Sequence, residues 1–117
     1  MSEPAPVYSR EVALARVGGD EELLNELIEV YLGDSPKWLA ELRKAAAERS
    51  PIELRRAAHT IKGAVGYFGS DEAGEAADRL QELGRAGDID AALAVVPRLE
   101  QALERLAAAL RAGRSPS

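Results

Sequence analysis

The sequence contains a single histidine, His59, in the segment AAHTIKG at positions 57–63. Histidine is the side chain that ordinarily changes charge near neutral pH, so its neutral ring can attack an electrophile through a nitrogen. Lys62 follows about one helical turn later, which brings an ammonium group within reach of a phosphoryl group on that ring. A nucleophile beside a cation suits phosphoryl transfer, because negative charge spreads over the oxygens of the transferred group.

A helix must present these side chains. Five apolar residues around the histidine share one face of a helical wheel and predict a buried stripe: Leu54, Ala58, Ile61, Val65 and Phe68. His59 falls on the other side, so we predict that its ring faces solvent. Gly63 and Gly66 lie on the histidine face, although glycine inside a helix costs about 1 kcal/mol relative to alanine. We interpret both glycines as access for a docking partner.

The pattern H-x-x-K-G, formed by His59, Lys62 and Gly63 and followed by Gly69, resembles the histidine-containing phosphotransfer (HPt) domains of bacterial and plant two-component phosphorelays. The resemblance covers roughly residues 9–111. It implies that His59 is the phosphoacceptor and that the partners are response-regulator receiver domains, a hybrid histidine kinase, or both. An aspartyl phosphate on one receiver would be the donor, and a second receiver would be the acceptor.

The chain lacks both the P-loop pattern and the glycine loop of protein kinases, so it has no recognisable way to take phosphate from ATP. We therefore predict a phosphocarrier, not an enzyme. By the resemblance, no cofactor belongs to the chain itself, since the partner receiver domain supplies Mg²⁺. No metal site is expected either, because one histidine and no cysteine leave only carboxylates as further ligands.

A helical hairpin places Gln81 opposite His59. His59 lies about 10 residues before the turn at Gly69-Ser70, and Gln81 lies about 11 residues after it. Proteins of the resembling family often have Gln or Glu there. The Gln81 amide could bond the second ring nitrogen and so orient the imidazole. Three arginines would add a locally positive rim: Arg55, Arg56 and Arg85.

The composition indicates one modest domain. The chain has 117 residues, and we predict a domain at 9–112 between disordered tails at 1–8 and 113–117. The net charge of −5 argues against sequence-independent nucleic-acid binding, which needs clustered cations. No apolar run of 18 or more residues is present, so we expect no membrane insertion. We expect a cytoplasmic monomer.

Caps and glycines predict an all-α fold. The expected helices are 10–17, 21–32, 36–48, 51–68, 71–85 and one that starts after Asp88 and continues past Pro97. Ser50 and Glu53 are expected to form a reciprocal capping box, and Ser70 is expected to cap the helix at 71–85. Short connections predict an antiparallel up-down-up-down four-helix bundle, with the two short N-terminal helices packed across it.

Two alternatives to a free-standing phosphocarrier remain. The chain could be the phosphoacceptor module of a hybrid or chemotaxis-type histidine kinase. It could also be a helical adaptor that binds a receiver without being phosphorylated. The presence of both His59 and Lys62 argues against the adaptor.

Overall fold

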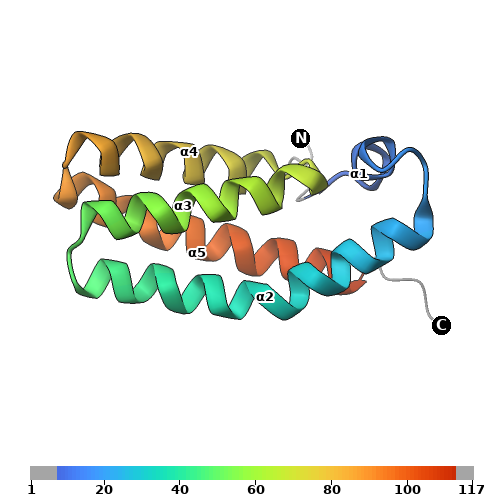
Figure 1. Ribbon diagram of the computed structural model, residues 1–117, viewed down its shortest axis with the longest axis horizontal. Coiled ribbons are helices and arrows are strands. Elements are labelled where there is room, and N and C mark those ends of the chain that lie inside the picture. The colour runs from blue at the N-terminus through green and yellow to red at the C-terminus, as the bar shows by residue number, and fades with distance from the viewer. Residues whose placement is uncertain (1–7, 113–117) are drawn as a thin grey trace, which may run out of the picture.

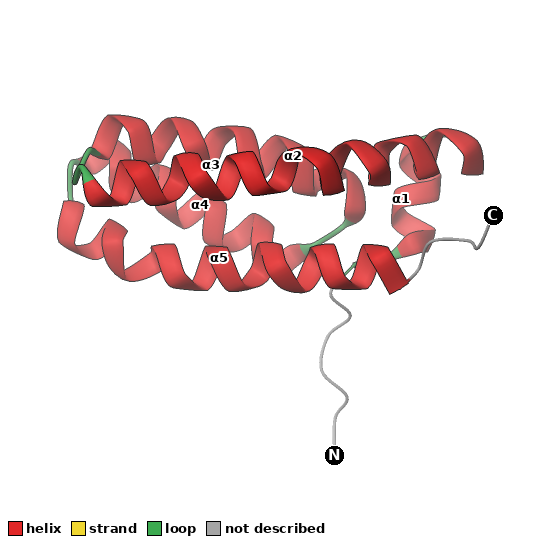
Figure 2. Ribbon diagram, turned by 90° about the horizontal axis from the view of Figure 1, so that it is seen from below, coloured by secondary structure: helices red, strands yellow, loops and turns green. Residues whose placement is uncertain are grey.

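The computed structural model describes residues 8–112, and every regular element among them is a helix. The elements are α1 (Arg10–Arg16), α2 (Glu21–Ala47), α3 (Pro51–Val65), the 3-10 helix η1 (Gly66–Phe68), α4 (Asp71–Ala86) and α5 (Ile89–Ala112). Helices α2 to α5 lie side by side along the longest axis, and α1 lies across one end (Figures 1 and 2). The all-α prediction is confirmed for these residues, whereas the predicted tails, apart from Tyr8, lie outside them.

One predicted break is wrong: α2 continues through Gly33 and Pro36 without a new start at Ser35. Pro36 cannot donate a backbone hydrogen bond, but the buried face stays in phase on both sides of it, so packing holds the helix together. The buried residues of α2 are Leu24, Ile28, Tyr31, Ser35, Leu42 and Ala45. Figure 1 shows α2 changing direction in its N-terminal part. Only α1, and not a pair of short helices, therefore lies across the others.

Most predicted caps are present. Four side chains accept a hydrogen bond from the backbone N–H three residues later: Ser9, Asp20, Ser50 and Asp88. The reciprocal half of the capping box is absent, because the Ser50 N–H donates to the Ala45 carbonyl at 3.1 Å. The Glu53 carboxylate instead accepts from Arg56 at 3.0 Å. Ser70 is the N-cap residue of α4, as expected, but its buried hydroxyl makes no capping hydrogen bond and has no hydrogen-bond partner.

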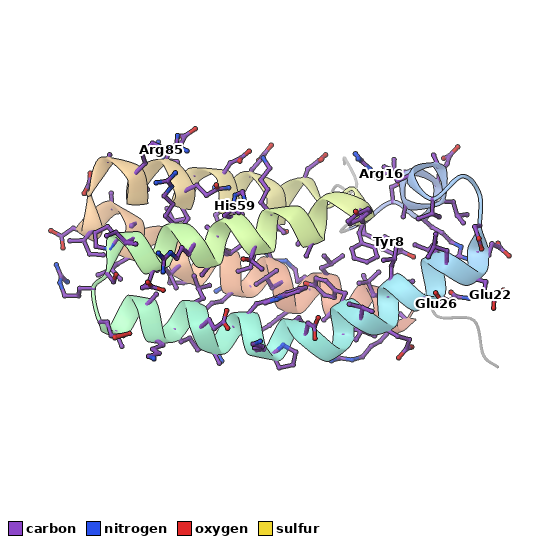
Figure 3. All side chains as sticks on the ribbon, viewed as in Figure 1. Tyr8, Arg16, Glu22, Glu26, His59 and Arg85 are labelled. Atoms are coloured by element: carbon purple, nitrogen blue, oxygen red, sulfur yellow. The ribbon has the colours of Figure 1, made fainter. Side chains whose placement is uncertain are left out.

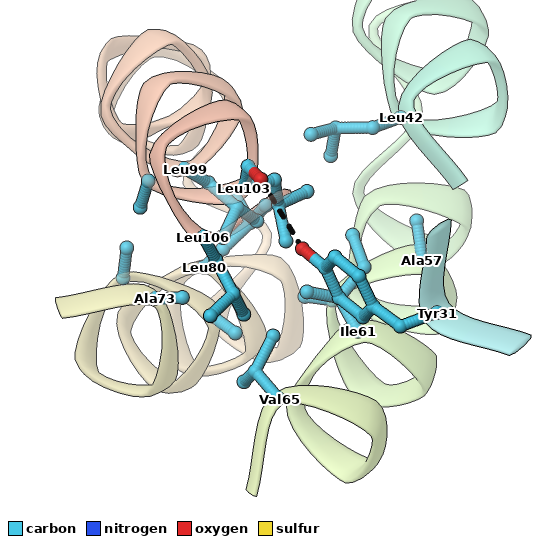
Figure 4. Close-up of a cluster of buried hydrophobic side chains, with 14 of the residues drawn as sticks. Tyr31, Leu42, Ala57, Ile61, Val65, Ala73, Leu80, Leu99, Leu103 and Leu106 are labelled. Atoms are coloured by element: carbon cyan, nitrogen blue, oxygen red, sulfur yellow. Dashed lines mark hydrogen bonds between the residues drawn. The ribbon is translucent and has the colours of Figure 1, made fainter. Parts of the chain in front are cut away.

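The predicted apolar face of α3 is buried, as expected. Its residues are Leu54, Ala58, Ile61 and Val65, and Phe68 in η1 continues the same buried face. They meet side chains from the neighbouring helices, including Leu80, Leu103 and Leu106 (Figure 4). The hydroxyl of Tyr31 donates to the carbonyl of Leu103 at 3.2 Å, and burial raises the pKa of Tyr31 well above its usual value. This packing fixes α3 with its opposite face toward solvent.

Small residues let α3 and α4 approach each other closely. Helix α4 buries Ala73, Ala76, Ala77 and Gly84. A Cβ atom added at Gly84 would lie 2.8 Å from the carbonyl oxygen of Pro51 and 3.0 Å from the Cβ of Arg55. Neither neighbour is the far end of a flexible side chain, so one helix would have to shift. Gly84 therefore sets the spacing between the two helices.

The variant Gly84→Ala is expected to lower the free energy of unfolding by about 1–3 kcal/mol, because overpacking outweighs the better helix propensity of alanine. Denaturant unfolding would measure the change. Gly74→Ala is the matched control on the same helix, since a Cβ there meets nothing within 4 Å. It should be neutral or stabilise the fold by up to about 1 kcal/mol. Equal responses of the two variants would contradict the close contact at Gly84.

Candidate functional site

His59 lies on the exposed face of α3, along the line where α3 and α4 run side by side (Figure 3). The Ser50 cap and Pro51 in the first turn start this helix, and its buried stripe sets its rotation. Ala57 and Ala58, directly before the histidine, are both buried. The imidazole is therefore open to solvent while its backbone is held by the core.

The structure brings His59 and Gln81 together, as the counting along the hairpin predicted. The distance from His59 Nδ1 to Gln81 Oε1 is 3.4 Å. An amide oxygen can only accept a hydrogen bond, so this contact is a hydrogen bond in the tautomer that carries the ring proton on Nδ1. The lone pair is then on Nε2, the nitrogen that is free to attack. The contact is present, and the orienting role of Gln81 stays a prediction.

A second link between the two helices involves a residue that the sequence analysis missed. Lys62 Nζ donates to Asp78 Oδ2, and the two side chains are 42% and 50% exposed. Lys62 lies three residues after His59, and Asp78 lies three residues before Gln81. The counting that identified Gln81 would therefore have identified Asp78 as well. The His59–Gln81 and Lys62–Asp78 contacts are thus two links that follow one another along the line of contact between α3 and α4, the seam.

The two glycines predicted to give access lie in open space. Gly63 and Gly66 are exposed, and a Cβ added to either would meet nothing within 4 Å. Helix packing therefore requires neither glycine. Gly69 differs, because its φ of +63° lies in the left-handed region, where it closes the turn between η1 and α4. Neither Gly63 nor Gly66 therefore adds a side chain to the surface beside His59, at the end of α3 and the start of η1.

A groove passes His59 toward the start of α3, and all three predicted rim arginines line it together with Ile52. Arg56 pairs with Glu53 at 3.0 Å. Within residues 8–112, Arg55 and Arg85 make no ion pair. Ile52 is 65% exposed and was not singled out from the sequence. The groove therefore combines an exposed apolar side chain with two unpaired cations.

Residues 8–112 offer neither a cluster of metal ligands nor a helix that could span a membrane. No group of three or more His, Cys, Asp or Glu side chains there is arranged to hold a metal ion. No described helix has the length and apolar character needed to cross a membrane.

Comparison with known proteins bears on the family and the fold of this chain. The model of the Hpt domain family matches residues 26–109. The structure is similar to the crystal structure of histidine-containing phosphotransfer protein B (HptB) from Pseudomonas aeruginosa, with a TM-score of 0.83. That alignment covers 93% of this chain and 95% of the other chain at 22% sequence identity, so it supports the fold alone. A comparison with curated protein sequences found no match.

Proposed function

The chain belongs to the Hpt domain family, and on that premise we propose that it is a phosphocarrier of a phosphorelay. It accepts a phosphoryl group on His59 from the aspartyl phosphate of one receiver domain and passes the group to the aspartate of another. The observation that carries the proposal is the contact of 3.4 Å between His59 Nδ1 and Gln81 Oε1 beneath an exposed ring. With Nδ1 bonded to Gln81, Nε2 stays accessible as the nucleophile, and the buried face of α3 holds the helix in place.

The transfer step conserves atoms and charge. The Nε2 lone pair of His59 attacks the phosphorus of the aspartyl phosphate, and an Nε2–P bond forms. The P–O bond to the aspartate breaks, and the carboxylate leaves with the electron pair. The ring keeps its proton on Nδ1 and becomes a phosphoimidazolium, whose N–H is a stronger donor to Gln81 Oε1. The reverse step delivers the group to the second receiver.

Other residues of the site have assigned roles in this proposal. Lys62 stabilises charge on the phosphoryl oxygens, since it lies one turn from His59 with a partly exposed side chain. Gly63 and Gly66 leave room for the receiver, because a methyl group added at either position would have no neighbour within 4 Å. Arg55 and Arg85, which make no ion pair within residues 8–112, add positive charge along the groove. Mg²⁺ is supplied by the receiver, and the chain needs no cofactor of its own.

The proposal extends to the organisation of the chain. Residues 9–112 act as one domain in which α2, α3, α4 and α5 alternate in direction, since they lie side by side and are joined by turns of a few residues. The domain acts as a monomer and has no kinase activity. It depends on other proteins for phosphate in both directions.

The test is transfer from radiolabelled phospho-receivers to the purified chain, followed by NMR of the product. We expect the label on His59 as the Nε2 phosphoramidate, because Gln81 occupies Nδ1. Gln81→Leu should load a mixture of ring isomers or load more slowly, since it lacks the acceptor. Phosphate found on Nδ1 of the parent chain would contradict the assigned tautomer. Receiver binding without any transfer would support the adaptor alternative.

A further inference from the structure

The ion pair between Lys62 and Asp78 joins a cation one turn from His59 on α3 to a carboxylate on α4. Both side chains are about half exposed, at 42% and 50%. Exposed ion pairs are weak and exchange easily, because water competes for both partners. Lys62 can therefore leave Asp78 at little cost when a stronger anion arrives.

A phosphoryl group on His59 would be such an anion. His59 and Lys62 lie one turn apart on α3, and Gln81 and Asp78 lie one turn apart on α4. The Lys62–Asp78 pair therefore lies one helical turn along from the His59–Gln81 contact, and the long Lys62 side chain is the group that both anions would share. A phosphoryl dianion carries more charge than a carboxylate and attracts the same ammonium group more strongly.

We propose that Asp78 is a positioning residue that holds Lys62 between transfer events and competes with the phosphoryl group for it. The inference rests on the proposed function. It assigns Asp78 the task of keeping the phosphohistidine from becoming too stable, so that the group can move onward. Removing the Asp78 charge shifts the phosphorylation equilibrium toward phosphohistidine and does so through Lys62.

The experiment loads His59 chemically and needs no receiver. Phosphoramidate donates its phosphoryl group to Nε2 and releases ammonia, so the P–N bond to ammonia breaks as the P–N bond to His59 forms. The phosphorylated fraction is measured by phosphorus NMR at a fixed ratio of phosphoramidate to ammonium. For Asp78→Asn, we expect an equilibrium constant about 3- to 10-fold higher than for the parent, the size expected for a charge interaction at an exposed site.

A double-mutant cycle separates action through Lys62 from a direct effect of the Asp78 charge. Lys62→Met should lower the equilibrium constant, and adding Asp78→Asn to it should change little more. Asp78→Glu should behave like the parent, because it restores the carboxylate. An Asp78→Asn effect that is as large in the Lys62→Met background as in the parent would overturn the proposal.

The matched control is Glu82→Gln, which removes one negative charge from the same helix. Glu82 is exposed and pairs with Arg79, not with Lys62. It should leave the equilibrium constant near that of the parent, and a rise equal to that of Asp78→Asn would overturn the proposal. A chain that loads from phosphoramidate but accepts nothing from receivers would contradict the proposed function and leave the Asp78 measurement valid.

Discussion

The variant His59→Gln is expected to take up no phosphoryl group at all from a radiolabelled phospho-receiver. His59 is the single histidine of the chain, so no other imidazole can act as the nucleophile beside Lys62. Gel separation followed by counting of the retained label measures the loss. Because the ring is exposed on α3, the free energy of unfolding should stay within about 0.5 kcal/mol of the parent.

The chemistry of the label provides the independent check on His59. A phosphoramidate loses phosphate in mild acid and keeps it in alkali, whereas an acyl phosphate on a carboxylate is lost in alkali. We expect the parent chain to show the first behaviour. Label that persists in His59→Gln, or that survives acid and is lost in alkali, would place the phosphate on another residue and contradict the assignment.

The variant Gly63→Leu is expected to slow transfer from a receiver by about 100-fold, since displacing reacting groups by about 1 Å is enough for a loss of that size. The position lies one turn past His59 on the same exposed face, and a leucine there would project into the path of the incoming aspartyl phosphate. The rate is measured by rapid quenching with excess phospho-receiver. Loading from phosphoramidate should stay near the parent rate, because the small donor needs no docking surface.

Gly63→Ala is the control for folding. A Cβ there meets nothing within 4 Å, so alanine should hold or raise helix stability by up to about 1 kcal/mol. Its transfer rate should lie between those of the parent and the leucine variant. A loss of thermal stability in Gly63→Ala with transfer intact would place Gly63 in a tight helix contact. Equal slowing of receiver and phosphoramidate loading in Gly63→Leu would point to damage at His59 itself.

Much of this site could be predicted from the sequence because it depends on periodicity. The stripe from Leu54 to Phe68 determined the rotation of the histidine helix, so His59 was expected on the solvent side, where it lies. The turn at Gly69 then supplied a reference point for counting along two antiparallel helices. Gln81 came from that count, and its oxygen lies 3.4 Å from the ring. The roles of these residues stay predictions until transfer is measured.

The errors arose where local signals compete with tertiary packing. Ser35 followed by Pro36 has the appearance of a helix start, but the apolar face of α2 stays in phase across it and the helix continues. The capping box at Ser50 required a free N–H that the preceding helix end already uses through Ala45. In both places the local structure depended on residues outside the short motif. The motif by itself was therefore not enough to predict it.

Asp78 and Gly84 were missed in the sequence for different reasons. Asp78 could have been found, because the count that identified Gln81 also places it opposite Lys62. Gly84 could not, since its importance comes from the distance to the carbonyl of Pro51, and no sequence pattern reports the spacing between helices. The pairing of Lys62 with Asp78 follows from the register of the two antiparallel helices, which counting along the sequence gives. The close approach of the helices at Gly84 follows from their packing in three dimensions, which counting does not give.

The two links between α3 and α4 also restrict how this protein can change over evolution. Inserting one residue into α4 between the turn and Asp78 would rotate the rest of the helix by about 100°. Asp78 and Gln81 would both leave the seam at once, although every chemical group was still present. The turns at 48–50 and 87–88 lie outside the segment that connects His59 to Gln81, so they have no such restriction. Homologous chains should therefore vary in sequence between these two residues while keeping the number of residues that separates them.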